Sequence, residues 1–264
     1  MFKELRFALY AIKKNIQNNV ELRTSFLMNV GGMAVNNIAF IILWVYFVKS
    51  VGVINGWTAL DIIALQGFTA LSYGLAYFLF AGIRKLPDYV ATGGLDRFIL
   101  SPKNLLLRIG TSWFVPSTLG DTLFGVICLV IYGIITSVTL YQIALMVLLI
   151  ILSTIIFLGV STAIYAMSLF FTDPESVTNS LYEIFLTPAI FHGGAFQGAT
   201  RFFFTFIIPS LLVGALPVEI IRDISMSKLS ILVALAIVWL IIPVAMFNKA
   251  IKKYESSNFM TFGS

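Results

Sequence analysis

The sequence predicts an all-α integral membrane protein, and three observations lead to this fold class. Of its 264 residues 59% are hydrophobic and 11% are charged, whereas about a quarter of the residues of a soluble domain are charged. The apolar residues gather in long segments, and the basic residues gather in a few of the connections between them. A soluble globule of this composition would expose a mostly apolar surface and aggregate. We therefore expect six transmembrane helices, an amphipathic interfacial helix at the N-terminus, and a re-entrant or interfacial outer hairpin before the last span.

The expected spans follow from the length of the apolar segments, since a bilayer core about 30 Å thick needs roughly 20 apolar residues in a helix. One long charge-free stretch supplies two spans, with a turn near residues 137–141. The segment 202–223 is short and broken by Pro209, Gly214 and Pro217, so we expect it to form the outer hairpin. The expected transmembrane domain covers residues 25–248, with these spans: 26–48, 60–83, 113–136, 142–171, 176–198 and 229–247.

The distribution of basic residues predicts the orientation. Thirteen of the 17 Lys and Arg residues lie before the first span, between the second and third, or after the last. Because cytoplasmic loops are enriched in Lys and Arg, both termini are expected in the cytoplasm of a multi-pass cell-membrane protein, with residues 249–264 as a cytoplasmic tail. The net charge of +5 then reflects topology, and we expect no nucleic-acid partner.

The N-terminal segment, residues 1–24, carries an apolar stripe at helical spacing. Leu5, Leu9, Ile12 and Ile16 are separated by four, three and four positions, and basic residues occupy other parts of the surface. This pattern predicts an amphipathic helix along the cytoplasmic face of the membrane. Such a helix either anchors the chain on acidic lipid alone or also contacts a partner protein.

The cytoplasmic connection between the second and third spans contains helix-breaking and helix-starting signals. Gly93 and Gly94 are expected to end the helix that leaves the second span, and residues 95–100 are expected to form a short helical turn. Ser101 followed by Pro102 resembles an N-cap with proline at the first helical position, so a further helix is expected to begin there.

The short element in this connection has an apolar side. Leu95, Phe98 and Ile99 would present an apolar face while Asp96 and Arg97 stay solvated. One interpretation is a small apolar knob that binds in a groove of a partner. The alternative is a solvated loop whose apolar residues pack against lipid.

Ionisable residues inside the membrane are costly and are candidates for function. Asp121 is expected within the third span, where it could line a path for a cationic cargo or pair with a basic residue. Alternatively it is a hydrogen-bonded packing residue beside Ser117 and Thr122. Glu183 lies about two turns into the fifth span, where it could stand at a cytoplasmic gate.

Three other polar residues have simpler interpretations. Asp61 forms a capping-box pattern with Thr58, and Asp173 with Pro174 resembles an N-cap followed by a first-position proline. His192 is the only histidine, and one histidine without neighbouring cysteines or acidic residues cannot form a structural zinc site. It is either a packing or interface residue, or a residue that contacts cargo or responds to pH.

Taken together, the chain resembles the ABC-2 type permeases of ATP-binding cassette transporters, in particular the smaller bacterial exporters. The resemblance rests on the six-span plan, the N-terminal amphipathic helix, Pro209 with Pro217, and the segment Gly94-Leu95-Asp96-Arg97-Phe98-Ile99-Leu100-Ser101-Pro102. It implies a coupling helix that inserts into a groove of an ATPase subunit. The residues that would form it are Gly94, Leu95, Asp96, Arg97, Phe98, Ile99 and Leu100.

The resemblance also implies partners. The sequence has no G-x-x-x-x-G-K-[ST] phosphate loop, so a separate ATPase subunit would bind ATP and Mg. Two permease chains, identical or related, would pair with two ATPase subunits. The expected function is export of a hydrophobic or amphipathic cargo, with no catalytic, cofactor-binding or metal-binding residue in this chain.

Two other classes of function stay open from the sequence. One is a channel or secondary transporter that works without ATP. The other is an integral membrane enzyme built on Asp121, Glu183 and His192. These three residues are expected at different depths, whereas a catalytic site needs groups within reach of one substrate.

Overall fold

A computed structural model describes residues 2–53, 55–100 and 102–254, and this part of the chain is helical without a strand. Five helical segments in it are long and apolar enough to cross a membrane. They are built on α2 (Arg23–Val51), α3 (Ala59–Phe80), α7 (Ser117–Ile135), α8 (Leu140–Ala166) and α12 (Met226–Ala250). These helices overlap five of the six expected spans.

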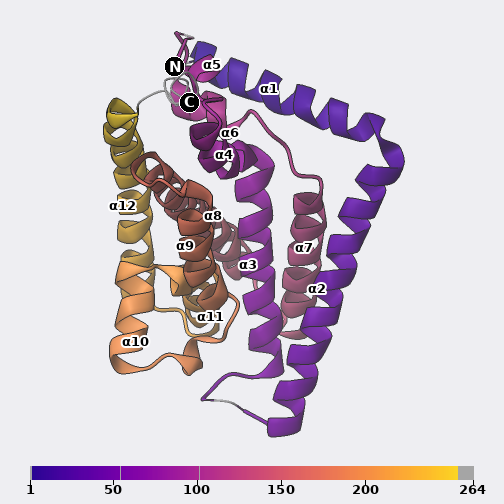
Figure 1. Ribbon diagram of the computed structural model, residues 1–264. Helices are drawn as coiled ribbons and strands as arrows, with labels where there is room; N and C mark the ends of the chain where they lie inside the picture. The colour runs from indigo at the N-terminus through magenta and orange to yellow at the C-terminus, as the bar shows by residue number, and fades with distance from the viewer. Residues whose placement is uncertain (1, 54, 101, 255–264) are drawn as a thin grey trace.

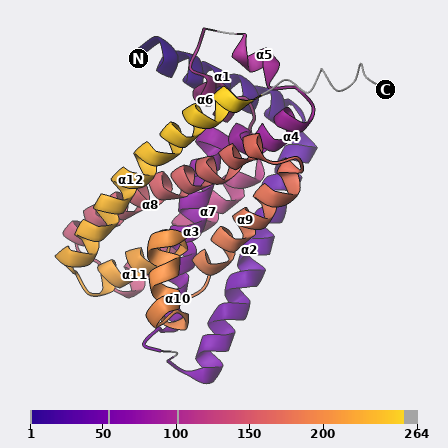
Figure 2. The same cartoon turned by 60° about the vertical axis from the view of Figure 1, so that its left-hand side comes forward.

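The long helices form a bundle whose two ends differ (Figure 1). α3 packs against α7 and α8, and α8 packs against α12. α1 (Phe2–Glu21) runs across one end of the bundle, together with α4 (Leu86–Ala91), α5 (Asp96–Ile99) and α6 (Leu105–Gly110). α12 finishes at this same end, so both ends of the described chain lie there (Figure 2).

The expected fifth span, residues 176–198, is wrong as a single helix. α9 (Pro174–Ala189) has 16 residues and contains Pro188. At 1.5 Å per residue it is roughly 24 Å long, which is shorter than a hydrocarbon core of about 30 Å. After it the chain turns through a 3-10 segment, Gly193–Ala195.

The break after α9 is stabilised by side chains of α3. The amide of Gln66 donates to the carbonyl of Ile190 at 3.1 Å, and the hydroxyl of Thr69 donates to the carbonyl of Ala189 at 3.2 Å. The last carbonyls of a helix have no partner within the helix. α3 therefore supplies the hydrogen bonds that let α9 end inside the protein.

A hairpin at the opposite end of the bundle occupies residues 198–222, close to the expected 202–223. Its first arm is α10 (Gly198–Phe202) with a π-helical turn, Phe203–Ile207, and neither contains a buried residue. Its second arm is α11 (Ala215–Arg222), in which all residues but the last are buried against the bundle. The second arm thus enters the protein while the first stays on its surface.

Two helices begin at other residues than the sequence predicts. The helix expected from Ser101 and Pro102 is α6, which begins at Leu105 because Asn104 is its N-cap, accepting from the backbone NH of Leu107 at 3.0 Å. Ser101 lies outside the described residues. The third span begins at Ser117 rather than at residue 113.

The expected turn near residues 137–141 is confirmed. α7 ends at Ile135, and Ser137 adopts a positive φ of 52°. Thr139 then forms a capping box with Gln142 at the start of α8. A polar cap therefore divides the long apolar stretch into two helices.

Candidate functional site

The connection between α3 and α7 is folded into three short helices, α4, α5 and α6, which we call the platform together with α1. Gly93 has a φ of +70°, a conformation that favours glycine, and it ends α4 as the sequence predicts. The backbone NH of Leu95 then donates to the carbonyl of Tyr89 at 3.1 Å, which folds α5 back onto α4.

The apolar residues of α5 point in two directions, and this corrects one expectation. Leu95 is 0% exposed and Phe98 is 7% exposed, so neither presents an apolar face to a partner. Ile99 is 45% exposed and Leu100 is 87% exposed. The exposed apolar pair is therefore Ile99, the last residue of α5, with Leu100, the C-cap that follows it, whereas Leu95 and Phe98 anchor the helix.

Phe98 holds α5 in place through aromatic and polar contacts. Its ring centroid lies 5.1 Å from that of Tyr89, and Arg108 donates from Nη1 to its carbonyl at 2.5 Å. The guanidinium of Arg97 lies 4.9 Å from the centroids of both rings. These contacts make α5 a fixed element rather than a solvated loop.

Within the platform, α1 packs against the residues that flank α6. Asn15 donates from Nδ2 to the carbonyl of Thr111 at 2.8 Å, and Glu4 accepts from the backbone NH of Asn104 at 3.2 Å. Ala8 is buried on the same side. α1 therefore braces the connection that carries α5.

Only part of the expected stripe of α1 takes part in this packing. Ile12 and Ile16 are partly buried, and Leu9 is 58% exposed. The side chain of Leu5 lies outside the described part of the chain. A membrane-surface position for α1 stays a prediction, with Leu9 on the side available to lipid.

Arg84 joins the platform to α9, a role that was not predicted from the sequence, where Arg84 is one of the basic residues of a cytoplasmic connection. It lies in the 3-10 turn Ala81–Lys85, between α3 and α4. Its Nη1 donates to the hydroxyl of Tyr73 at 3.3 Å, and its guanidinium lies 5.1 Å from the ring of Tyr77 and 6.0 Å from that of Tyr182 on α9. Among the described residues no carboxylate pairs with it. The signal in the sequence was two tyrosines four positions apart, one and two helical turns before the turn that holds Arg84.

Asp121 lies at a polar cavity between helices. The residue is 3% exposed, its Oδ1 accepts from Asn37 of α2 at 2.7 Å, and its Oδ2 is buried without a hydrogen-bond partner among the described residues. The expected local partners do not bind it: Thr122 donates to the carbonyl of Thr118 instead. The cavity has a volume of about 290 Å³ and is lined from α2, α3, α7 and the end of α9 by Met33, Asn36, Asn37, Phe40, Gln66, Thr69, Ala70, Tyr73, Asp121, Leu186 and Ile190.

An aromatic cluster lies just beyond this cavity, toward the hairpin end of the bundle. Trp44 of α2 contacts Phe191 edge to face at 5.3 Å between centroids, and His192 lies 6.5 Å from Trp44 and 6.0 Å from Trp57. Burial lowers the pKa of His192, which favours the neutral imidazole. His192 thus packs between two tryptophans, and its Nδ1 has no partner among the described residues.

Glu183 lies on the exposed face of α9. Four other polar residues share that face at helical spacing, and all are exposed in the single chain: Ser176, Asn179, Ser180 and Thr187. Neither Glu183 nor His192 lines the cavity of Asp121. The structure therefore does not bring the three ionisable candidates into one constellation, and in the described residues no group of three His, Cys, Asp or Glu could hold a metal ion.

The two capping predictions are confirmed. Thr58 and Asp61 form a capping box at the start of α3, and the carboxylate of Asp173 accepts from the backbone NH of Ser176 at 3.2 Å. Asp61 additionally pairs with Arg222 at 3.4 Å. Both acids have structural partners and are not candidates for transport chemistry.

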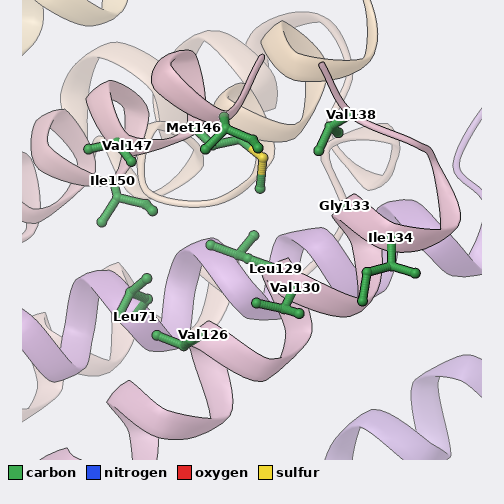
Figure 3. Close-up of a pocket in the computed structure, with 11 residues that line it drawn as sticks. Leu71, Val126, Leu129, Val130, Gly133, Ile134, Val138, Met146, Val147 and Ile150 are labelled. Carbon is green, nitrogen blue, oxygen red and sulfur yellow. The ribbon is translucent and has the colours of Figure 1, made fainter. Parts of the chain in front are cut away.

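A larger groove between α7 and α8 has no polar side chain (Figure 3). It has a volume of about 440 Å³, and its walls include Leu129, Met146 and Ile150. A ligand site needs a few placed polar groups to orient its ligand. This groove gives none, so the candidate site consists of the exposed end of α5, the Arg84 contacts and the Asp121 cavity.

The helices define a multi-pass membrane protein. The chain belongs to the ABC-2 family transporter proteins, because the model of that family matches residues 34–258. The match runs from within α2 to beyond α12 and confirms the resemblance to ABC-2 type permeases. No curated protein and no solved structure matches the chain.

Proposed function

We propose that this chain is the permease subunit of an ABC exporter that moves a hydrophobic or amphipathic cargo outward. A separate ATPase subunit binds ATP and Mg, and two such subunits pair with two permease chains, identical or related. The observation that carries the proposal is the exposed pair Ile99 and Leu100 on a helix fixed by Leu95 and Phe98.

The exposed pair suits a protein partner. Two adjacent large apolar side chains on a rigid helix bury apolar area at about 25 cal/mol per Å² when a groove covers them. Arg97, Lys103 and Arg108 lie in the same connection. Because basic residues concentrate on the cytoplasmic side, the platform end of the bundle is assigned to the cytoplasm, where an ATPase can bind it.

The contacts of the platform supply a route from the ATPase to the membrane part. α4 packs against α9, and Arg84 contacts Tyr182 of α9. Leu186 of α9 and Ile190, its C-cap, in turn contribute to the wall of the Asp121 cavity. A displacement of the platform on ATP binding would therefore move the helix that closes one side of the cavity.

A second permease chain fits the exposed polar face of α9. Polar side chains at membrane depth are costly when they face hydrocarbon, and Glu183 with its four polar neighbours faces away from the described chain. α2 has no buried residue in its membrane span, and Asn36 on it lines the cavity. We place the partner chain and the cargo path along α2 and α9.

The Asp121 cavity is the proposed cargo contact within one chain. Phe40, Leu186 and Ile190 supply apolar wall, and the free Oδ2 of Asp121 can accept a hydrogen bond from a cationic or neutral donor group. The Trp44 and Phe191 contact covers the outer side of the cavity. A cargo with an apolar body and one donor group matches this lining.

Co-purification tests the proposal. The chain is expressed with a candidate ABC ATPase and extracted in detergent, and the complex is measured by pull-down and size exclusion. Ile99→Asp with Leu100→Asp is expected to abolish the complex while the permease stays folded, because both side chains are exposed. The matched control is Leu140→Asp, which changes a leucine that is 82% exposed at the opposite end of the bundle, and it is expected to leave the complex intact.

A complex that is unaffected by the double substitution, or no complex with any ABC ATPase, would contradict the proposal. Transport that persists in vesicles without ATP would instead support a channel or secondary transporter.

A further inference from the structure

The outer hairpin and the start of α12 line a pocket of about 300 Å³. This pocket is separate from the Asp121 cavity. Two cationic side chains, Arg201 and Lys228, lie on its wall. Thr205 also lines it, with its hydroxyl donating to the carbonyl of Arg201 at 2.7 Å. The remaining wall is largely apolar and includes Phe202, Phe206, Leu211, Leu216 and Ile231.

The two cations share one buried carboxylate. Glu219 of α11 is 4% exposed; Arg201 donates from Nη2 to both of its oxygens at 2.8 Å, and Lys228 donates from Nζ to Oε2 at 2.8 Å. Burial alone would raise the pKa of Glu219, but the hydrogen bonds from Lys228 and Arg201 outweigh it and hold that pKa below its ordinary value. The cluster therefore carries two positive charges and one negative charge at neutral pH.

The surplus positive charge is accessible. The side chains of Arg201 and Lys228 are 41% and 36% exposed. Arg201 contacts Glu219 only through Nη2, so its Nε and Nη1 can donate to another anion. None of the residues that line the pocket is acidic.

The pocket lies beside the start of α12, the last candidate membrane span, so we expect it near the lipid headgroups. Lys228 is in the first turn of α12, and the apolar span follows directly. Phe202, Phe206 and Ile231 are exposed by 59%, 42% and 38%. Exposed apolar side chains thus share the wall of the pocket with the two cations.

We propose that this pocket binds an anionic phospholipid of the surrounding membrane. The phosphate lies between Arg201 and Lys228, and an acyl chain follows Phe202, Phe206 and Ile231. The bound lipid links the exposed arm of the hairpin to α12. The proposal is independent of transport and of any ATPase, since it concerns the permease chain alone.

The test uses the full chain in a neutral detergent, with lipid binding measured by native mass spectrometry. Phosphatidylglycerol is compared with phosphatidylcholine of the same acyl chains, and glycerol 3-phosphate is added as a soluble competitor. Glu219→Gln raises the cluster charge by one, and the triple variant Arg201→Gln, Glu219→Gln, Lys228→Gln removes all three charges without leaving one unpaired. Lys49→Gln is the control, because it removes an exposed cation from the same end of the molecule.

The wild-type chain is expected to prefer phosphatidylglycerol. Since a basic residue near the surface contributes about 1 kcal/mol of attraction to anionic lipid, Glu219→Gln should bind it about fivefold more tightly and the triple variant about fivefold more weakly. Lys49→Gln should bind like the wild type. Thermal unfolding of each variant shows whether it is folded.

Three results would overturn the proposal. One is an equal loss of binding in Glu219→Gln and the triple variant, which would make hairpin structure rather than charge responsible. Another is equal affinity for the two lipids. The third is full displacement by glycerol 3-phosphate, which would show a site for a free anion without an acyl chain.

Discussion

The guanidinium of Arg84 lies 6.0 Å from the ring of Tyr182. This contact joins the turn that begins the platform to α9, the broken helix whose last residues line the Asp121 cavity. In the proposed mechanism the contact transmits platform movement to the cargo path.

Arg84→Met retains much of the side-chain volume and removes the charge. A cation–π contact contributes about 0.5–2 kcal/mol, so ATP-driven transport is expected to fall roughly fivefold while ATPase binding is unchanged. Tyr182→Phe keeps the ring and should transport normally. Transport per ATP hydrolysed, measured in proteoliposomes, distinguishes the two variants, and equal activity of Arg84→Met and the wild type would contradict the proposed route.

Asp121→Asn separates charge from packing. The asparagine oxygen can still accept the hydrogen bond from Asn37, so the free energy of unfolding should change by less than about 1 kcal/mol. Transport of an amphipathic cation should fall at least about tenfold, which corresponds to 1.4 kcal/mol, whereas transport of a neutral amphipathic cargo should persist. A uniform loss for both cargoes, measured in vesicles, would assign Asp121 a purely structural role.

Acid should destabilise the hairpin through Glu219. The pKa of this carboxyl is lower in the folded chain than its ordinary value of 4.5, so it contributes stability above pH 4.5 that is lost as the pH falls through the folded-state pKa. The unfolding temperature in detergent should therefore decrease as the pH is lowered below about 4.5. Glu219→Gln should show a smaller decrease, and an identical pH profile in both chains would contradict the assignment.

Close packing of α8 on α12 predicts a strong effect at Gly159. A Cβ at this position would collide with the backbone carbonyl of Trp239, whereas a Cβ at Gly31 of α2 would meet no atom within 4 Å. Gly159→Ala should lower the free energy of unfolding by about 1–3 kcal/mol. Gly31→Ala should be neutral or slightly stabilising, because alanine favours helix by up to about 1 kcal/mol. Chemical denaturation in mixed micelles compares the two.

The sequence predicted the features that depend on neighbouring residues. Long apolar runs indicated the five candidate membrane-spanning helices, and the predicted caps at Thr58 and Asp173 form through local hydrogen bonds. It could not predict where α9 ends, because apolar residues continue beyond Ala189 and the stabilising donors, Gln66 and Thr69, come from α3.

The candidate site was predicted less well, for the same reason. A four-residue helix with apolar residues on several sides does not reveal that Phe98 packs inward under Arg108 while Leu100 stays exposed. The partner of Asp121 is Asn37, which is 84 positions away in the chain. Contacts between segments that are distant in the sequence decide which residues of a predicted motif stay exposed to a partner.

The central claim is that Leu100 lies in a groove of an ABC ATPase, and site-directed cross-linking in membranes tests it most directly. Cys128 is the only cysteine and is buried, so Cys128→Ala gives a background in which Leu100→Cys is the single reactive thiol. We expect Leu100→Cys to cross-link to cysteines placed in the ATPase groove, and Leu140→Cys to give no product. Equal cross-linking at both positions, or none at Leu100→Cys in a chain that transports cargo, would contradict the claim.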